Sequence, residues 1–447
     1  MKQMRWLFFA TAVLLLLAAC GGGEEPETAV SDTTETVPNP PTPEPAATPT
    51  LAPPPVVVVE EGGAESGGEE PAPAPEVVEE EKIRPWPTDK FGYGVQVHGN
   101  ATVGDPIFTM DTVQNQLGLD WVKMQLQWWL VHPSPGADQW FFYDGVIDEA
   151  ANHNLNLMIS VVGSPDWTRA QGNHTGPPDD YNEYANFLTE LINRHPGKID
   201  AIEVWNEQNL DREWQTPSGV IDPTEYVRFL EVAYNAIKAA DPNIIVISGA
   251  LSPTGPGDWV RWADDFEYMD QALAAGMLNY ADCVGAHHNG YNVPPDVIVE
   301  DTNSLPESQT AEFRGPFDNQ YTNGQLNHLW TFKTTIDGYA QRIDAYDPNM
   351  ELCVTEFGWA SSEGYDAPPE GFEFALDNTL EEQAQYIVQA FQQMHDSGDV
   401  WLAFLFNYDF GNKGSGPQDD PVPYSIIDIN GAPRPAFSAV ANMEKPD

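Results

Sequence analysis

The sequence is poor in positive charge, and this shortage excludes several classes of partner. It contains 19 lysines and arginines against 69 aspartates and glutamates, which gives a formal net charge of −50 at pH 7. Nucleic acids, other polyanions and anionic membrane surfaces repel so acidic a chain, and we expect none of them as partners. The charge suits an extracellular domain that acts on a neutral substrate.

Cysteine is scarce as well, with only Cys20, Cys283 and Cys353 in the chain. The last two lie within apolar, strand-like runs, where a buried free thiol is the usual state. A disulfide between them is the less favoured alternative. No spacing of cysteine and histidine typical of a zinc site is present. We therefore expect two free thiols, and neither a metal ion nor a cofactor.

Long apolar runs are rare, and the one that stands out is N-terminal. A short basic region precedes an apolar run at 6–19, which is shorter than the roughly 20 residues that span a bilayer. No basic stop-transfer cluster follows, so residues 1–19 are predicted to be a signal peptide. The run ends Leu17-Ala18-Ala19-Cys20, which resembles the lipobox of bacterial lipoproteins. This resemblance implies that Cys20 is lipidated and anchors the protein in the cell envelope; the alternative is an ordinary signal peptide.

The segment that follows, to residue 85, contains almost no aromatic residues. It consists mainly of Pro, Glu, Thr, Ala, Val and Gly, and it can bury too little apolar surface to offset its chain entropy. We predict that residues 20–85 comprise the lipidated cysteine and a disordered, extended, acidic linker. Nearly all tryptophan, tyrosine and phenylalanine lie in 86–447, which has no internal repeat and no second linker and is predicted to be a single domain.

Apolar runs alternate with helical patterns eight times along this domain. The expected strands are 94–98, 121–129, 156–162, 201–205, 244–248, 283–287, 352–355 and 400–406. The expected helices are 107–117, 143–153, 181–194, 223–240, 262–275, 332–346, 380–395 and 434–443, with an irregular insertion at 289–329. The alternation indicates an α/β fold with a parallel sheet. Eight units, with no Gly-rich phosphate turn, favour a single (β/α)8 TIM barrel over an open doubly wound sheet.

Two of the expected strands end in a glutamate beside an aromatic residue. The fourth ends in Trp205-Asn206-Glu207, and the seventh in Thr355-Glu356-Phe357. A buried carboxylate is costly, and the carboxyl ends of barrel strands carry the chemistry of this fold. Strands four and seven face each other across the barrel mouth, so the two glutamates can act on one sugar. One would protonate the glycosidic oxygen while the other attacks the anomeric carbon.

These motifs resemble those of the glycoside hydrolase clan A superfamily, which comprises retaining enzymes built on (β/α)8 barrels. The resemblance covers about 91–443 and is closest to families 39 and 5, with family 39 slightly preferred. It implies that Glu207 is the acid/base, that Glu356 is the nucleophile, and that Asn206 holds the 2-hydroxyl of the sugar at the cleavage point. Gln208 stands where many members have proline, which is expected to change the turn rather than the chemistry.

Further candidate substrate-binding residues lie at or just after the expected strand ends. Clan members often place a histidine or an aromatic residue after strand six, and polar sugar-binding side chains after strands one and two. Exposed aromatic rings can stack on the apolar faces of sugars, although each could instead pack the core. The candidates are His98, Gln127, Trp167, His287, Tyr291, Trp359 and Tyr408.

Three functions from different classes are compatible with the sequence. The favoured one is retaining hydrolysis of β-linked oligo- or polysaccharides by a monomeric, lipid-anchored enzyme. The second is transglycosylation by the same two glutamates, which only product analysis separates from hydrolysis. The third is non-catalytic glycan binding at the cell surface, which the presence of both glutamates disfavours. The loops determine which sugar and linkage the protein recognises, and a single sequence does not show which loops matter.

Overall fold

The computed structural model describes residues 82–304 and 327–446. The predicted signal peptide, Cys20, nearly all of the predicted linker and part of the insertion predicted at 289–329 lie outside the described residues. Within the described part of the chain, every helix is too short or too polar to cross a lipid bilayer.

Eight parallel strands form one sheet in the order β5-β4-β3-β2-β1-β8-β7-β6. The strands are β1 Gly92–Gln96, β2 Trp121–Gln127, β3 Asn156–Val162, β4 Ala201–Val204, β5 Ile245–Ser248, β6 Val284–Gly290, β7 Leu352–Trp359 and β8 Val400–Leu405. Between β5 and β6 the pairing is reduced to two parallel bridges, Ile247 with Cys283 and Leu251 with Ala286. The sheet thereby closes on itself, and the predicted (β/α)8 barrel is confirmed.

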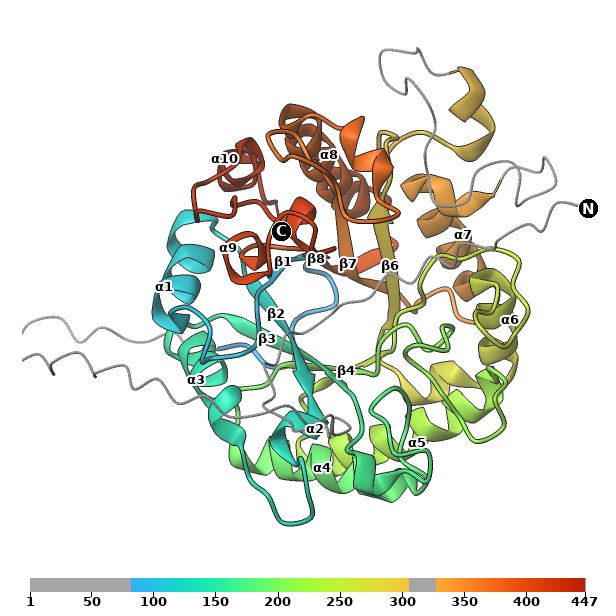
Figure 1. The fold of residues 1–447 in the computed structure, drawn as a ribbon. Coiled ribbons are helices and arrows are strands. Elements are labelled where there is room, and N and C mark those ends of the chain that lie inside the picture. The colour runs from blue at the N-terminus through green and yellow to red at the C-terminus, as the bar shows by residue number, and fades with distance from the viewer. Residues whose placement is uncertain (1–81, 305–326, 447) are drawn as a thin grey trace, which may run out of the picture. The chain divides into compact units, whose positions relative to one another are not determined.

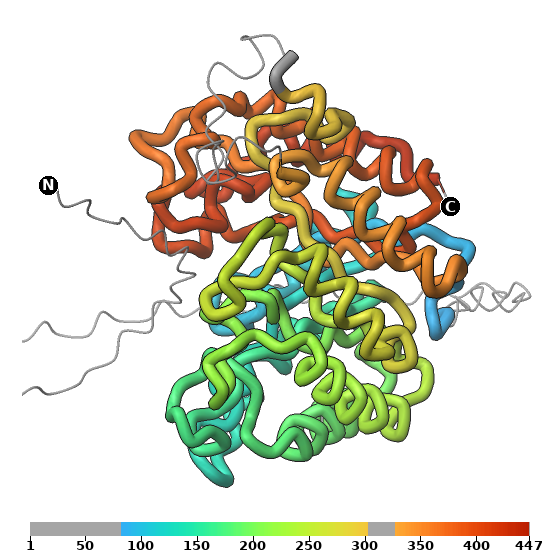
Figure 2. The backbone as a smooth tube through the Cα atoms, turned by 90° about the vertical axis from the view of Figure 1, so that its right-hand side faces the viewer, coloured from blue at the N-terminus to red at the C-terminus, as the bar shows by residue number. Residues whose placement is uncertain are grey.

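Helices form an outer layer around these strands (Figures 1 and 2). The α-helices are α1 Pro106–Asp111, α2 Trp128–Val131, α3 Asp144–Asn152, α4 Tyr181–Arg194, α5 Pro223–Ala240, α6 Asp265–Ala274, α7 Phe332–Asp344, α8 Leu380–Ser397, α9 Phe410–Lys413 and α10 Pro435–Asn442. Side-chain caps begin the longest of them: Asp180 and Asp222 accept from backbone amides of α4 and α5, and Thr379 forms a capping box with Glu382 on α8. Such caps satisfy the amides that have no partner within the helix.

The N-terminal half of the barrel interior is filled by large apolar side chains. Trp121, Leu402 and Phe404 belong to one buried cluster there, and two glycines of β1 make room for them. A Cβ atom on Gly92 would lie 2.5 Å from Leu402, and one on Gly94 would lie 2.4 Å from Phe404. This half of the barrel is therefore a packed core, and any ligand must enter from the opposite end.

Cys283 and Cys353 form a disulfide within this cluster, with Cα atoms 5.9 Å apart. The prediction of two free thiols is therefore wrong. The two residues are 70 positions apart in the chain, but β6 and β7 are neighbours in the barrel. Their ladder pairs Gly285 with Cys353, which brings the two inward-facing cysteines within the usual disulfide range.

Strands β6 and β7 extend beyond their predicted ends, and this extension shapes the mouth of the barrel. After a register shift between Ala286 and His287, the pairing continues with His287 opposite Glu356 and ends with Gly290 opposite Trp359. Glu356 thus lies inside a strand rather than after it. A strand residue is held by ladder hydrogen bonds on the backbone, so its side chain has a well-defined direction.

Candidate active site at the carboxyl end of the barrel

Glu207 is positioned by an unusual backbone turn directly after β4. Trp205 and Glu207 have φ angles of 78° and 43°, in the left-handed region that costs residues other than glycine about 1–3 kcal/mol each. The buried indole of Trp205 packs on Trp214 with ring centroids 5.5 Å apart, and the amide of Glu207 donates to the carbonyl of Ala250 at 2.9 Å. These contacts hold the strained turn and direct the Glu207 side chain into the barrel mouth.

The two residues after Glu207 tie this turn to the loop that follows β5. The Gln208 amide donates to the carbonyl of Gly249 at 2.7 Å. Asn209 accepts from the amide of Ser252 at 2.9 Å and donates to the Ser252 carbonyl at 2.8 Å. A proline could not make the side-chain bond of Gln208, so the glutamine provides a specific anchor for the turn.

Glu356 enters the mouth from β7, and both of its oxygens are bonded. The Lys123 ammonium donates to Oε1 at 3.0 Å and also to the Thr355 carbonyl at 3.0 Å. The Asn289 side-chain amide donates to Oε2 at 3.4 Å. The carboxylate is therefore held in one orientation by an ion pair from β2 and a hydrogen bond from β6.

A fully buried charged layer lies beneath the two glutamates. Lys123 is 3.7 Å from a carboxylate oxygen of Glu203, and both side chains are almost completely excluded from solvent. Glu203 also accepts from Thr355 Oγ1 at 2.7 Å, from Ser160 Oγ and from the amide of Ala250. Buried charges are tolerated only when paired and hydrogen-bonded, and this layer meets both conditions.

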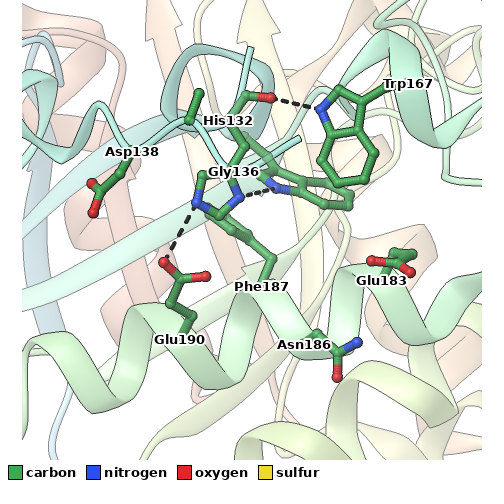
Figure 3. Close-up of a pocket in the computed structure, with 10 residues that line it drawn as sticks. His132, Gly136, Asp138, Trp167, Glu183, Asn186, Phe187 and Glu190 are labelled. Atoms are coloured by element: carbon green, nitrogen blue, oxygen red, sulfur yellow. Dashed lines mark hydrogen bonds and ion pairs between the residues drawn. The ribbon is translucent and has the colours of Figure 1, made fainter. Parts of the chain in front are cut away.

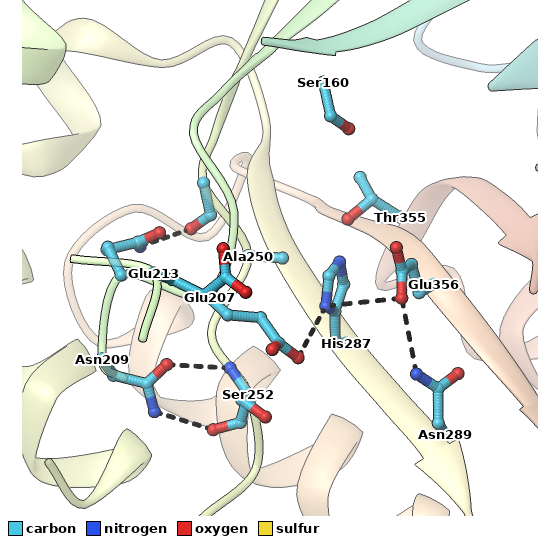
Figure 4. Close-up of polar contacts among 12 residues, drawn as sticks. Ser160, Glu207, Asn209, Glu213, Ala250, Ser252, His287, Asn289, Thr355 and Glu356 are labelled. Atoms are coloured by element: carbon cyan, nitrogen blue, oxygen red, sulfur yellow. Dashed lines mark hydrogen bonds and ion pairs between the residues drawn. The ribbon is translucent and has the colours of Figure 1, made fainter. Parts of the chain in front are cut away.

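His287 lies between Glu207 and Glu356 (Figure 4). Its Nδ1 is 3.4 Å from Glu207 Oε1 and 3.9 Å from Glu356 Oε2, and its ring is buried. Burial by itself lowers the pKa of His287, but the charge of Glu356 and the hydrogen bond to Glu207 outweigh it and raise the pKa overall. One imidazole thus contacts both carboxylates and carries a proton more readily than a free histidine.

Glu207 is ionised in this arrangement. Burial favours its neutral form, but the hydrogen bond to His287 and the charge of Arg212 outweigh burial and lower the pKa of Glu207 to about 2. Arg212 Nη2 donates to Glu207 Oε2 at 2.9 Å. Because Glu207 and His287 share one hydrogen bond, they titrate as a pair.

Solved structures were compared with this barrel. A glucosidase from Croceicoccus marinus aligns with a TM-score of 0.52 and 14% identity, over 79% of this chain and 66% of that one. A family 5 glycoside hydrolase from Streptomyces cattleya, crystallised with GlcNAc, aligns with a TM-score of 0.53 and 14% identity, over 79% of each chain. A variant of it with Manβ1-4GlcNAc aligns with a TM-score of 0.52, over 80% and 83%. The chain has the fold of these glycoside hydrolases. Neither a protein-family model nor a curated protein sequence matches it.

Several residues of the mouth were not predicted from the sequence. Three of them could have been identified from the sequence, because each is a polar residue at an inward-facing position of a strand: Lys123, Glu203 and Asn289. Arg212 and Glu213 lie on the loop after Glu207, where no periodicity applies. Burial and the neighbouring charge of Glu207 raise the pKa of Glu213 to about 8, so a third carboxyl of the mouth is mostly protonated at neutral pH.

The histidine pair of β6 divides between two environments, as the alternation of a strand requires. His287 faces the mouth, whereas the Nε2 of His288 donates to the carbonyl of Leu329 at 2.9 Å. Burial lowers the pKa of His288 to about 4, which keeps it neutral. Tyr291 is half-buried, and its ring meets Phe374 edge-on at 5.0 Å. Burial and then the charge of Glu207 raise the pKa of the Tyr291 hydroxyl, which places it within the field of the acidic site.

Other predicted substrate-binding residues have different surroundings. The half-buried His98 lies 5.2 Å from the ring of Phe410, and Gln127 accepts from the indole of Trp129 at 3.2 Å. Asn206 is mostly buried beside Glu207.

Two of the predicted sugar platforms are core residues. Trp359 is fully buried, and its indole donates to the carbonyl of Val293 at 3.0 Å. Tyr408 is only 3% exposed and packs near Phe437 on α10. Neither ring has a face open to a ligand, so the structure does not support sugar stacking for either. Of the aromatic residues predicted to bind sugar, Trp359 and Tyr408 thus belong to the core, whereas Trp167 is exposed.

Trp167 lies on a separate groove of about 410 Å³ between α2, the loop at 132–138 and α4 (Figure 3). Its side chain is 39% exposed, and its indole donates to the carbonyl of His132 at 2.9 Å. Glu183 and Asn186 of α4 also line the groove. None of the lining residues belongs to the cluster around Glu207 and Glu356, so the structure does not bring Trp167 into that cluster.

The described residues contain no group of three or more histidine, cysteine, aspartate or glutamate side chains arranged to hold a metal ion.

Proposed function

We propose that the protein is a retaining glycoside hydrolase that cleaves O-glycosidic bonds in β-linked oligo- or polysaccharides. Glu356 is the nucleophile and Glu207 the acid/base. The observation that carries the proposal is the position of His287, whose Nδ1 lies within 3.4 Å of Glu207 and 3.9 Å of Glu356. Two carboxylates, one from the turn after β4 and one from β7, therefore converge on one point in the barrel mouth.

The shared contact with His287 limits how far apart the two carboxylates can lie. Two oxygens that approach the same nitrogen atom are no farther apart than the sum of their distances to it. Retaining enzymes hold their carboxyls about 5–5.5 Å apart, whereas inverting enzymes need roughly 6.5–9.5 Å to admit a water molecule. Oε1 of Glu207 and Oε2 of Glu356 are therefore at most 7.3 Å apart, which admits the retaining geometry, and the anomeric configuration of the product decides between the two mechanisms.

The surroundings of each glutamate suit its role. Lys123 and Asn289 orient the Glu356 carboxylate for attack on the anomeric carbon, with one partner on each oxygen. Glu207 protonates the leaving oxygen. After the leaving group departs, the ionised form of Glu207 can activate the water that hydrolyses the glycosyl-enzyme. By resemblance to the clan, Asn206 binds the 2-hydroxyl. We retain families 5 and 39 as the candidate families.

Hydrolysis of a panel of aryl β-glycosides, β-glucan, xylan and mannan tests this proposal. We expect wild type to cleave at least one member with retention of anomeric configuration, followed by ¹H NMR. Glu207→Ala should lose about 10²–10⁴-fold in rate, because general acid–base catalysis contributes that much. With an activated aryl glycoside, azide should restore part of that rate and yield a β-glycosyl azide.

Glu381→Ala, at an exposed position of α8, is the control and should match wild type. A wild type that binds a glycan but cleaves no panel member would favour the surface-binding function instead. Elongated products in place of reducing ends would favour transglycosylation.

We also propose that the protein is exported and anchored in the cell envelope through Cys20. The Cys283–Cys353 disulfide supports export, because disulfides persist in oxidising compartments and are rare in the cytosol. In a bacterial host, wild type should incorporate a radiolabelled fatty acid and fractionate with membranes, whereas Cys20→Ser should do neither. Label on the Cys20→Ser protein would contradict this assignment.

A further inference from the structure

Both oxygens of Glu207 are occupied in the free protein. Oε1 faces His287 at 3.4 Å, and Oε2 accepts from Arg212 at 2.9 Å. The carboxylate is only 13% exposed, whereas Arg212, on the loop at the edge of the mouth, is 39% exposed. A general acid must present a protonated oxygen to the leaving group, and a guanidinium on that oxygen favours the opposite, ionised state. The free site is therefore held in a form that cannot perform the first chemical step.

Arg212 has a second carboxyl within reach. Its Nε is 3.8 Å from an oxygen of Glu213, the next residue in the chain, and the charge of Asp420 from the loop after β8 also acts on it. Burial and the charge of Glu207 raise the pKa of Glu213. Arg212 therefore lies within ion-pair distance of both Glu207 and Glu213, and the raised pKa of Glu213 favours the protonated form of that second carboxyl.

The other charged groups around Glu207 do not duplicate this arrangement. His287 contacts Glu207 from β6 and also faces Glu356 on β7. Tyr291 follows β6, and burial and then the charge of Glu207 raise the pKa of its hydroxyl. Lys123 of β2 forms ion pairs with Glu356 and with Glu203 of β4, and Glu203 belongs to the buried layer beneath the mouth. Arg212 is the cation that approaches Glu207 from the solvent side, where a leaving group would emerge.

We propose that Arg212 is a positioning residue that controls when Glu207 can act as an acid. On this view, which rests on the proposed function, the incoming leaving-group sugar displaces the guanidinium from Glu207 Oε2 toward Glu213. The move stabilises the Glu213 carboxylate and removes the cation that kept Glu207 ionised. One proton passes from Glu213 to Glu207: the O–H bond on Glu213 breaks, an O–H bond on Glu207 forms, and the number of protons in the site is unchanged.

The pH dependence of kcat/KM tests the inference, measured with an aryl glycoside that has a poor leaving group and with its dinitrophenyl counterpart. Arg212→Met removes the cation, so the pKa of Glu207 should rise and the basic limb of the profile should move up by about one pH unit or more. Glu213→Gln removes the proton donor. It should lower kcat at least about tenfold for the poor leaving group and leave the dinitrophenyl glycoside unaffected, because that leaving group needs no acid.

Arg261→Met is the matched control, because Arg261 is exposed on a nearby loop and pairs with Asp258; its profile should match wild type. An unmoved basic limb in Arg212→Met, or an equal loss on both substrates in Glu213→Gln, would overturn the inference while the hydrolase proposal stands.

A ¹³C NMR titration of carboxyl-labelled glutamates, assigned with Glu207→Gln, gives a readout that needs no activity. Arg212→Met should shift the Glu207 titration to higher pH. An unchanged titration would show that Arg212 does not control the protonation of Glu207, even if the protein hydrolysed nothing.

Discussion

Glu356→Gln should lower kcat for glycoside hydrolysis by on the order of 10⁴-fold or more, because an amide cannot attack the anomeric carbon. The substitution keeps the size of the side chain, so KM should change little. A 2-deoxy-2-fluoro glycoside of the preferred sugar should inactivate wild type by accumulating the covalent intermediate. Mass spectrometry of the digested protein should then locate the sugar on the peptide that contains Glu356.

The control for this prediction is Glu351→Gln. Glu351 directly precedes β7 at the opposite end of the barrel, so its replacement tests whether any change on this strand impairs activity. We expect activity within twofold of wild type. Label on Glu207 or Glu213, or substantial turnover by Glu356→Gln, would show that the nucleophile is misassigned.

Lys123→Met should lower the free energy of unfolding by about 3–5 kcal/mol, the usual cost of removing one partner from a buried ion pair. Lys123 is fully buried and bonds Glu356 at 3.0 Å, with Glu203 at 3.7 Å. Without its charge, the carboxylates of Glu203 and Glu356 would lose their shared ammonium partner. Urea unfolding, followed by tryptophan fluorescence, measures the change.

Lys333→Met is the matched control for Lys123→Met. Lys333 pairs with Asp337 on the surface of α7, where both side chains are well exposed, so its loss should cost less than about 1 kcal/mol. Adding Glu203→Gln to Lys123→Met should recover part of the lost stability, because one of the two uncompensated charges is removed. Equal stability of Lys123→Met and wild type would mean that the buried charge layer is not formed.

Much of the barrel could be predicted from local patterns. The structure has β3 at 156–162, α4 at 181–194 and α5 at 223–240, the ranges predicted from the sequence. These elements have strong periodicity and clear ends, such as the Asp180 cap and Pro223 at the start of a helix. The ends of β6 and β7 were predicted too early, because their last residues are polar or aromatic and are held in the sheet only by pairing with each other.

Part of the candidate site could also be predicted from the sequence, and part of it could not. Glu207 and Glu356 could be recognised because each ends an apolar run in a place where a carboxylate has no structural use. Trp359 and Tyr408 share that position in the chain, yet both are buried, since sequence position does not reveal which side of a strand end faces the core. His287 could be proposed from its place after strand six, but its contact with both glutamates depends on how the strands meet.

The sequence by itself therefore determined the eight strand–helix units and pointed to the two candidate glutamates, because hydrophobic periodicity and strand ends are local properties of the chain. Only the tertiary structure decided which distant residues meet. The contact between Lys123 and Glu356 spans 233 positions, and the disulfide spans 70. Both depend on the closure of the barrel and on the register of neighbouring strands, and a shift of one residue would turn each side chain to the opposite face.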